Sequence, residues 1–237
     1  PAAGYSFSGW SGACAGTSEC NVYMDQARSV TALFTINRYA LTIEKYGTGS
    51  GVVTSNLEGI DCGNDCLANY DYNKTVTLSA NADQSSVFMG WSDSNCLGLM
   101  TTCVVTMDDA KTVTANFSAT YPVSVTKDGT GTGRVISNLG GISCGSICTS
   151  VFVYGDSVTL TAIPELGYTF SGWSGVDVSD CSGNTCTFNS ITAAKSVNAT
   201  FTVNSYTLGG VVNGLLPNSQ VVLVNGSDSV TVLSGAT

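Results

Sequence analysis

The sequence contains no histidine, and charged residues occupy only 11% of its 237 positions. Without histidine the chain lacks the commonest general base and the commonest metal ligand of proteins, and it cannot complete a serine–histidine–aspartate triad. Basic residues are scarce as well, with 8 against 17 acidic ones, and the net charge of −9 opposes binding to nucleic acid and anionic membranes. No apolar run approaches the roughly 20 residues of a membrane-spanning helix. These absences argue against catalysis, nucleic-acid binding and membrane insertion by this segment.

The sequence does contain a repeat with a period of about 82 residues. The segment Tyr39–Gly51 returns as Tyr121–Gly133, 82 positions later. The three tryptophans, Trp10, Trp91 and Trp173, are 81 and 82 positions apart and stand at the same place in each copy. Each copy ends on a similar predicted strand, and these closing strands are 30–34, 113–117 and 197–201.

The phase of the repeat divides the chain into four parts. Residues 37–118 (repeat I) and 119–203 (repeat II) are full copies, and residues 1–36 (the half repeat) are the C-terminal half of a preceding copy. Residues 204–237 soon depart from the pattern and begin a different β module. Because both ends cut through a domain, we expect the chain to be a fragment of a longer tandem array.

Apolar and polar residues alternate along most of each repeat, as in half-buried strands. Val113, Ala115 and Phe117, for example, share one face of a predicted strand. The glycine-rich segments 47–51 and 129–133 supply the positive φ angles of tight turns. Because no stretch carries a helical stripe, we predict an all-β chain, with at most a short turn near Met107.

One feature conflicts with simple alternation. Trp173 lies three residues after Phe170, which places it on the wrong face of a regular strand. Gly172 between them predicts a β-bulge that turns the tryptophan inward. We therefore expect each tryptophan to pack in the core against the neighbouring disulfide and the closing-strand phenylalanine. The predicted core residues are Trp10, Trp91, Trp173, Phe34, Phe117 and Phe201.

The ten cysteines fall into five close pairs, which favour local disulfides. A disulfide tolerates the varied spacing, because it requires only that two Cβ atoms lie about 4 Å apart. The rival interpretations are a Cys₄ zinc site, which usually needs C-x-x-C spacing, and a redox-active pair, which needs a nearby cation. Disulfides imply an oxidising, extracellular or periplasmic setting. The predicted pairs are Cys14–Cys20, Cys62–Cys66, Cys96–Cys103, Cys144–Cys148 and Cys181–Cys186.

Three further site hypotheses have weaker support. The turn 61–65 offers carboxylate and amide oxygens to calcium, although it lacks EF-hand spacing, and no other cofactor is indicated. No carboxylate stands in a motif that marks it as catalytic. Glycan binding through exposed aromatic rings is the main functional alternative, with Tyr70, Tyr72 and Tyr154 as the least constrained candidates.

The repeated motifs resemble the divergent internalin B-repeat family of bacterial surface proteins. They include Tyr39-Ala-Leu-Thr-Ile43, Gly47–Gly51, Phe88-Met-Gly-Trp91 and Val113–Phe117, and the resemblance covers residues 1–203. It implies β-rich modules of roughly β-grasp character, strung along secreted or cell-surface proteins as stalks, spacers or adhesive arms. The family supplies no catalytic residues to carry over. Repeat II departs from the family pattern at 189–195.

We therefore predict a non-enzymatic structural region of a bacterial extracellular protein, acting as a stalk or spacer or as part of a fibre. Its expected partners are neighbouring repeats or other copies of the same protein. The alternative is an adhesin module that binds a glycan or a host receptor.

Overall fold

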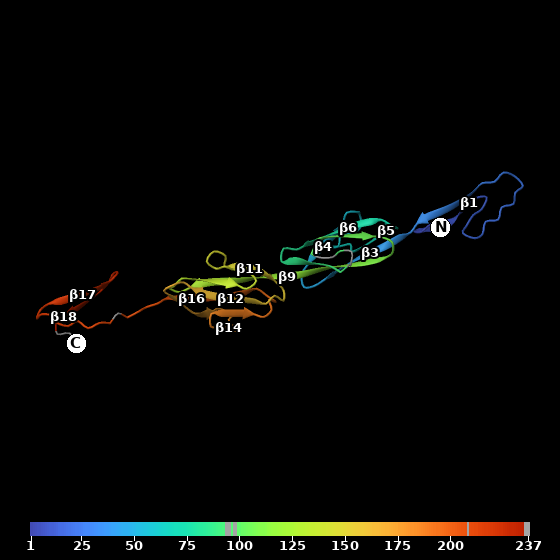
Figure 1. Cartoon of the computed structure of the whole chain (residues 1–237). Helices are drawn as coiled ribbons and strands as arrows, with labels where there is room; N and C mark the ends of the chain where they lie inside the picture. The colour runs from blue at the N-terminus through green and yellow to red at the C-terminus, as the bar shows by residue number, and fades with distance from the viewer. Residues whose placement is uncertain (93–95, 97–98, 208, 235–237) are drawn as a thin grey trace. The chain divides into compact units, whose positions relative to one another are not determined.

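All regular structure in the computed structural model is β-strand, within the residues that it describes, which are 1–92, 96, 99–207 and 209–234 (Figure 1). The chain separates into two bodies, Pro1–Thr202 and Val203–Thr237. The all-β prediction is confirmed.

Repeat I consists of two sheets that enclose one apolar core. Its strands are β3 (Arg38–Tyr46), β4 (Gly51–Ser55), β5 (Leu67–Asp71), β6 (Thr75–Ala82), β7 (Ser86–Trp91), β8 (Thr102–Thr106) and β9 (Lys111–Asp128). Among the described residues, the larger sheet has the order β7-β9-β3-β5 and the smaller has the order β4-β6-β8. β3 and β9 are parallel, and the other neighbours are antiparallel.

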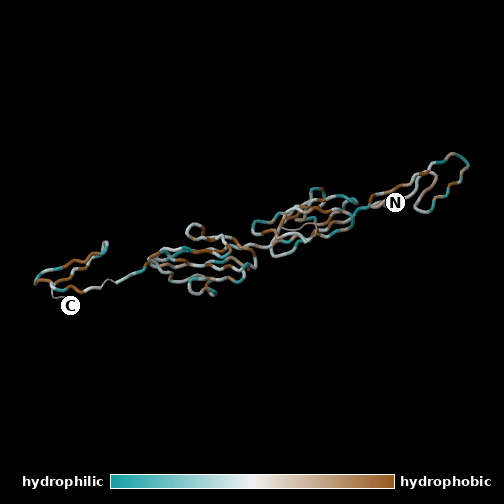
Figure 2. Tube along the Cα trace, viewed as in Figure 1, coloured by the Kyte–Doolittle hydropathy of each residue, from teal (hydrophilic) through white to brown (hydrophobic). Residues whose placement is uncertain are grey.

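The alternation in the sequence explains the core. Leu41 and Ile43 of β3 point inward from the larger sheet and are 0% and 3% exposed. Val76 and Leu78 of β6 meet them from the smaller sheet and are fully buried. Apolar residues therefore colour the strands of both sheets at intervals in Figure 2.

Repeat II has the same two-sheet plan. Its further strands are β10 (Gly133–Ser137), β11 (Thr149–Val153), β12 (Val158–Pro164), β13 (Tyr168–Ser174), β14 (Cys181–Ser182), β15 (Thr185–Phe188) and β16 (Lys195–Val203). The larger sheet has the order β13-β16-β9-β11, and the smaller has the order β10-β12-β15-β14. β9 and β16 are parallel, as β3 and β9 are in repeat I.

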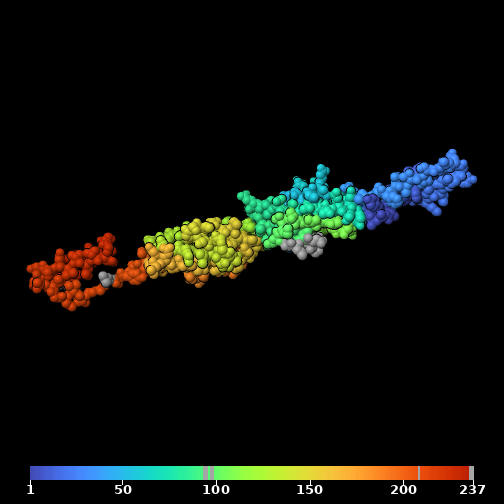
Figure 3. Space-filling view, turned by 45° about the horizontal axis from the view of Figure 1, so that its top comes forward, coloured from blue at the N-terminus to red at the C-terminus, as the bar shows by residue number. Residues whose placement is uncertain are grey.

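β9 belongs to both repeats. Its first part pairs with β3 and closes repeat I, and its second part pairs with β11 and β16 and opens repeat II. Backbone hydrogen bonds from Thr120 N to Ser85 O (2.9 Å) and from Tyr154 N to Ala119 O (2.8 Å) flank the junction. The two repeats meet there without a linker (Figure 3). Repeat I thus passes into repeat II through hydrogen-bonded backbone.

The junction that precedes repeat I is similar. β1 (Tyr5–Gly12) and β2 (Val30–Ile36) form an antiparallel hairpin, and only Asn37 separates β2 from β3. Asn37 N donates to Gly4 O at 2.8 Å, and Asn37 O accepts from Tyr72 N at 2.8 Å. The second of these bonds is the counterpart of the Tyr154–Ala119 bond at the later junction.

Two structural expectations need correction. The β-grasp character implied by the family resemblance is not seen in the described residues, because a second sheet covers the inner face of the larger sheet. Phe34 is not buried in this chain, where the residue is 51% exposed. The half repeat contains only the β1–β2 hairpin among its strands, so no second sheet covers Phe34 as the smaller sheets cover its counterparts Phe117 and Phe201.

The second body contains one hairpin, made of β17 (Gln220–Asn225) and β18 (Asp228–Leu233). Gly226 in its two-residue turn has a φ of 61°, a left-handed conformation that favours glycine. Its strands differ in sequence from those of the repeats.

Candidate functional site

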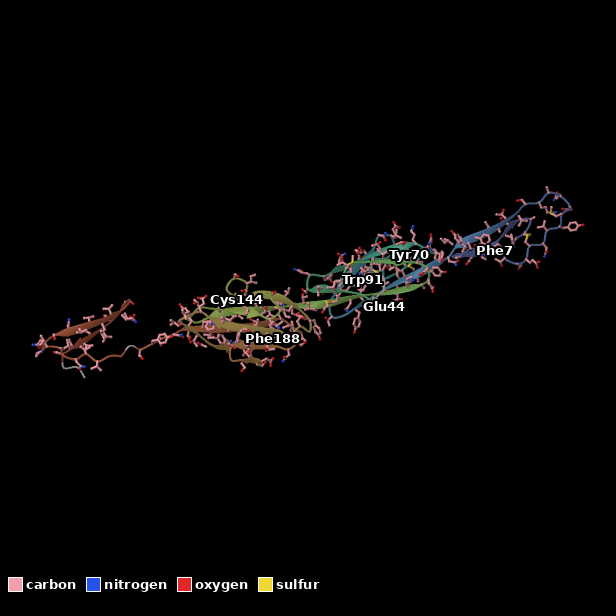
Figure 4. The ribbon with its side chains drawn as sticks, viewed as in Figure 1. Phe7, Glu44, Tyr70, Trp91, Cys144 and Phe188 are labelled. Atoms are coloured by element: carbon pink, nitrogen blue, oxygen red, sulfur yellow. A yellow bond between two sulfur atoms is a disulfide. The ribbon has the colours of Figure 1, made fainter. Side chains whose placement is uncertain are left out.

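The cysteines form the five local pairs expected from their spacing. The structure joins Cys14 to Cys20, Cys62 to Cys66, Cys96 to Cys103, Cys144 to Cys148, and Cys181 to Cys186. Cys62 and Cys144 are completely buried in their repeats, so these staples are part of the core. Cys144 is labelled in Figure 4. With no unpaired cysteine in the structure, the thiolates that a Cys₄ zinc site needs are absent.

Each tryptophan is the outer member of a stack of three aromatic rings. In repeat I, the Phe88 ring lies 5.1 Å from that of Trp91 and 5.3 Å from that of Phe117, measured between centroids. Figure 4 labels Trp91 within this repeat. The same stack recurs as Trp10–Phe7–Phe34 and as Trp173–Phe170–Phe201.

The predicted bulge produces this stack. The pairing of β1 with β2 shifts between Phe7 and Gly9, and that of β7 with β9 shifts between Phe88 and Gly90. The bulge prediction is confirmed at these two sites, and Gly172 has the same φ as Gly9, 144°. The tryptophans themselves are half-buried, and their ring contact is with the phenylalanine three residues earlier rather than with the closing strand. The middle phenylalanine was missing from the predicted core.

Glycines at the ends of the glycine-rich turns make room for the innermost ring. A Cβ atom on Gly51 would lie 2.3 Å from the Phe117 ring, and one on Gly133 would lie 2.2 Å from the Phe201 ring. These glycines are therefore required for close packing, beyond the turn geometry that the sequence suggested.

A loop closed by a disulfide covers the first two tryptophans. The Trp10 indole Nε1 donates to Ser18 O at 2.9 Å, and the Trp91 Nε1 donates to Met100 O at 3.1 Å. Both acceptors lie between the two cysteines of a disulfide, Cys14–Cys20 in one case and Cys96–Cys103 in the other. The expected association of tryptophan with disulfide thus takes the form of a hydrogen bond to the enclosed backbone.

Trp173 differs from its two counterparts. Its Nε1 is buried and has no hydrogen-bond partner. Beside it lies a groove of about 620 Å³, here called the Trp173 groove. The groove is lined by Phe170, Ser171, Trp173, Val178, Ser182 and Asn184, among others, and none of its lining residues is charged.

A carboxylate anchors the segment between Trp173 and Cys181. Asp177 accepts hydrogen bonds from the Ser196 backbone N–H at 2.8 Å and from Lys195 Nζ at 3.1 Å. These two donors, the Ser196 amide first, lower the pKa of the Asp177 carboxyl below its ordinary value of 3.8. The ion pair with Lys195 is half-buried. This anchor was not identified from the sequence. In repeat I the corresponding amide, Thr114 N, donates instead to Ser92 Oγ at 3.0 Å.

The tyrosines proposed as glycan contacts have different environments. Tyr70 is 6% exposed, and its hydroxyl lies 3.1 Å from Ser55 Oγ, so the expectation that it faces solvent is wrong (Figure 4). It occupies the place of Phe152 in repeat II, which explains its burial. Tyr72 is half-buried beside Tyr39, and Tyr154 is 43% exposed.

The turn proposed for calcium is held by its own backbone. Asp61 N donates to Asp65 O, and Asp65 N donates to Asp61 O. The described residues contain no group of three or more histidine, cysteine, aspartate or glutamate side chains placed to hold a metal ion. They also contain no helix that is long and apolar enough to cross a membrane.

The fold and these stacks define a class of protein, a tandem array of disulfide-stapled β repeats. Comparison with protein families assigns the chain more closely. The model of the divergent InlB B-repeat domain matches residues 1–38, 41–120 and 121–205, and the chain belongs to this family. The three matched segments follow the half repeat, repeat I and repeat II. A search of curated proteins finds no match.

Solved structures of pilins show a distant likeness. The major pilin protein (T-13) of Streptococcus pyogenes is 10% identical, with a TM-score of 0.29 over 70% of this chain and 97% of the pilin. The shaft pilin spaA of Lactobacillus rhamnosus GG is 7% identical, with a TM-score of 0.22 over 72% of this chain and 98% of the pilin. These TM-scores are too low to support an inference about this chain.

Proposed function

We propose that the chain is a structural repeat region of a bacterial extracellular or cell-surface protein, acting as a stalk or spacer or as part of a fibre. The observation that carries this proposal is β9, which is both the closing strand of repeat I and the opening strand of repeat II. Because no flexible linker separates the repeats, force applied along the array passes directly through hydrogen-bonded backbone.

The disulfides and the family support the same role. Each staple closes a loop within one repeat, with a sequence separation of four to seven residues. Such bonds persist in an oxidising environment outside the cell, where small domains need them most. Membership of a repeat family also favours a segment whose copies are added to extend a surface protein.

A change in the number of repeats tests the proposal. In the parent protein, a tag is placed at the end of the array that lies away from the cell. Deleting repeat I should bring this tag nearer to the cell surface, and adding a second copy of repeat I should move it farther away. Immuno-electron microscopy of the tag measures this distance, and images of the native particle distinguish a single arm from a fibre. Unchanged distances in both variants would refute the spacer role.

A glycan array provides the complementary test. An adhesin requires specific glycan binding that is lost when exposed Tyr154 is replaced by alanine, whereas a spacer requires no such binding. Tyr154→Ala should leave the array's extension unchanged.

A further inference from the structure

The Trp173 groove is the counterpart of two sites that hold peptide in the other repeats. In the half repeat, Gly16 O accepts a hydrogen bond from Trp10 N at 2.8 Å, and Ser18 O accepts one from the indole. The loop approaches so closely that a Cβ atom on Gly9 would lie 3.0 Å from Gly16 O. In repeat I, Met100 O takes the place of Ser18 O at the indole of Trp91.

The corresponding space in repeat II is open. A Cβ atom on Gly172, the counterpart of Gly9, would meet no atom within 4 Å. The Trp173 Nε1 lacks the carbonyl acceptor that both other indoles have. Trp173 thus both lines an open groove and holds a buried indole N–H without a partner.

The disulfide loop beside Trp173 is shorter than those beside Trp10 and Trp91, which explains why the groove is open in repeat II. The Cys181–Cys186 disulfide has a sequence separation of five, against six and seven for its counterparts. Its loop is the tight β14–β15 hairpin, in which Cys181 pairs with Cys186. The longer segment before Cys181 does not supply the acceptor either, because Asp177 anchors it to Lys195 and Ser196.

The chemistry of the groove defines its ligand. An unpaired buried N–H lowers the stability of the folded chain, so an acceptor that reaches it is bound favourably. Phe170 and Val178 offer apolar contact, while Ser182 and Asn184 offer neutral hydrogen-bonding groups. Without a charged lining residue, the groove favours an uncharged ligand. Since Nε1 is shielded from solvent, binding requires a small shift of the lining side chains.

We propose that the Trp173 groove binds a peptide loop of another protein chain, whose backbone carbonyl accepts the hydrogen bond of Trp173 Nε1. The loop is uncharged and consists of small residues, as Ala15-Gly-Thr-Ser18 does over Trp10. A peptide is favoured over a sugar because both sister sites accommodate peptide carbonyls in this position. The groove thus gives repeat II an attachment site for a partner, in addition to the proposed role of the array as a spacer.

Nuclear magnetic resonance of the full chain tests the groove before any ligand is added. The chain has three indole N–H signals, which single Trp→Phe variants assign. The signal of Trp173 should lack the downfield shift that hydrogen bonding gives those of Trp10 and Trp91. A Trp173 signal with the same shift as the other two in the free protein would show that the donor is already satisfied and would overturn the proposal.

A peptide titration tests binding. The probe is the disulfide-closed peptide of residues 14–20, with Glu19→Gln to remove its charge. It should shift the Trp173 signal downfield and leave those of Trp10 and Trp91 in place. Because a small peptide in solution gains little after its entropic costs, binding in the millimolar range is expected. If the Trp173 indole signal does not shift at peptide concentrations up to about 10 mM, the interaction is too weak for a binding site and the proposal is wrong. A response to neutral oligosaccharides in place of the peptide also contradicts the proposal.

A matched pair of variants locates the site. Ser182→Tyr fills the groove and should weaken peptide binding by about tenfold, which corresponds to about 1.4 kcal/mol. Ser146→Tyr adds the same ring to an exposed serine in the other disulfide loop of repeat II and should leave binding unchanged. Equal affinities of the two variants would place the peptide elsewhere. The spacer role would survive that result, because it depends on β9 and is tested by repeat number.

Discussion

Phe88 and Phe170 each hold two other aromatic rings in contact, one on the closing strand and one at the edge of the core. The edge-to-face geometry of these pairs contributes about 0.5–1.5 kcal/mol each beyond the burial of apolar area. The two stacks have nearly the same centroid distances, so the repeats differ mainly in what the indole N–H meets. Trp91 and Trp173 can therefore be compared within one molecule to measure the contribution of the indole hydrogen bond.

Trp91→Phe should destabilise repeat I more than Trp173→Phe destabilises repeat II. Both changes remove similar ring area, but only the first removes a formed hydrogen bond, to Met100 O. The second removes a buried donor without a partner. We expect a difference of about 1–2 kcal/mol in the free energy of unfolding. Amide hydrogen exchange in the full chain measures each repeat separately, and equal losses would contradict the assigned indole environments.

Asp177 should stabilise repeat II in a pH-dependent way. Its pKa in the folded protein is lowered, chiefly by the Ser196 amide and then by Lys195, so its contribution is fully present above the ordinary value of 3.8. The contribution is lost as the pH falls below that value and through the folded pKa. Asp177→Asn should therefore be less stable than the natural chain at pH 5–7, by less than about 1 kcal/mol, and equally stable in strong acid.

Denaturant unfolding of both proteins between pH 2 and 7 measures this difference. Asp180→Asn, an exposed carboxylate on the same segment, serves as the control and should show no comparable trend. A difference between Asp177→Asn and the natural chain that persists or grows in acid would contradict the assignment.

The alternation of the sequence predicts single strands better than it predicts their partners. It identifies the inward faces of β3, β6 and β9, and the spacing of Phe and Trp predicts the bulge. It could not show that β9 serves two repeats, because sheet membership depends on contacts between distant segments. The errors have the same origin: Phe34 follows the core pattern but lacks a covering sheet, and Tyr70 is polar but replaces a buried phenylalanine.

The disulfide loops show a similar limit. Their spacing identifies the five pairs, since each pair is local. The Trp173 groove results from a difference of one or two residues in loop length, together with the Asp177 anchor. Only the three-dimensional arrangement shows which carbonyl reaches which indole.

Thr120→Pro should weaken the junction between repeat I and repeat II. Proline removes the N–H that donates to Ser85 O and also fixes the backbone φ angle, whereas Thr120→Val keeps both the N–H and the β-branched side chain. We expect Thr120→Pro to reduce protection of junction amides from hydrogen exchange by about 1–2 kcal/mol relative to Thr120→Val. Similar exchange in the two variants would show that this bond does not couple the repeats.

Over the whole molecule, every covalent staple lies within one repeat, and none joins one repeat to another. Each full repeat has its own apolar core as well. The array therefore resembles a chain of modules that unfold singly, although neighbours share a strand.

Single-molecule pulling should detect this modularity. Each full repeat should unfold in one step, and reduction should lengthen the step because residues inside the disulfide loops are released. From the loop separations of four and seven in repeat I and four and five in repeat II, we expect gains of about 30 Å and about 25 Å. Steps of the same length with and without reductant would contradict the disulfide assignment.

The position of β9 also sets the order in which the repeats fold during synthesis. A repeat cannot complete its larger sheet until its last strand has been synthesised, because that strand pairs beside the first. A polypeptide leaves the ribosome or a secretion channel with its N-terminus first, so repeat I completes its larger sheet before repeat II. Once β9 has paired with β3, its C-terminal part is available to pair with β11 and β16 of repeat II. Folding in this order gives each strand a partner within its own repeat before the next repeat is complete, which disfavours strand exchange between repeats of the same fold.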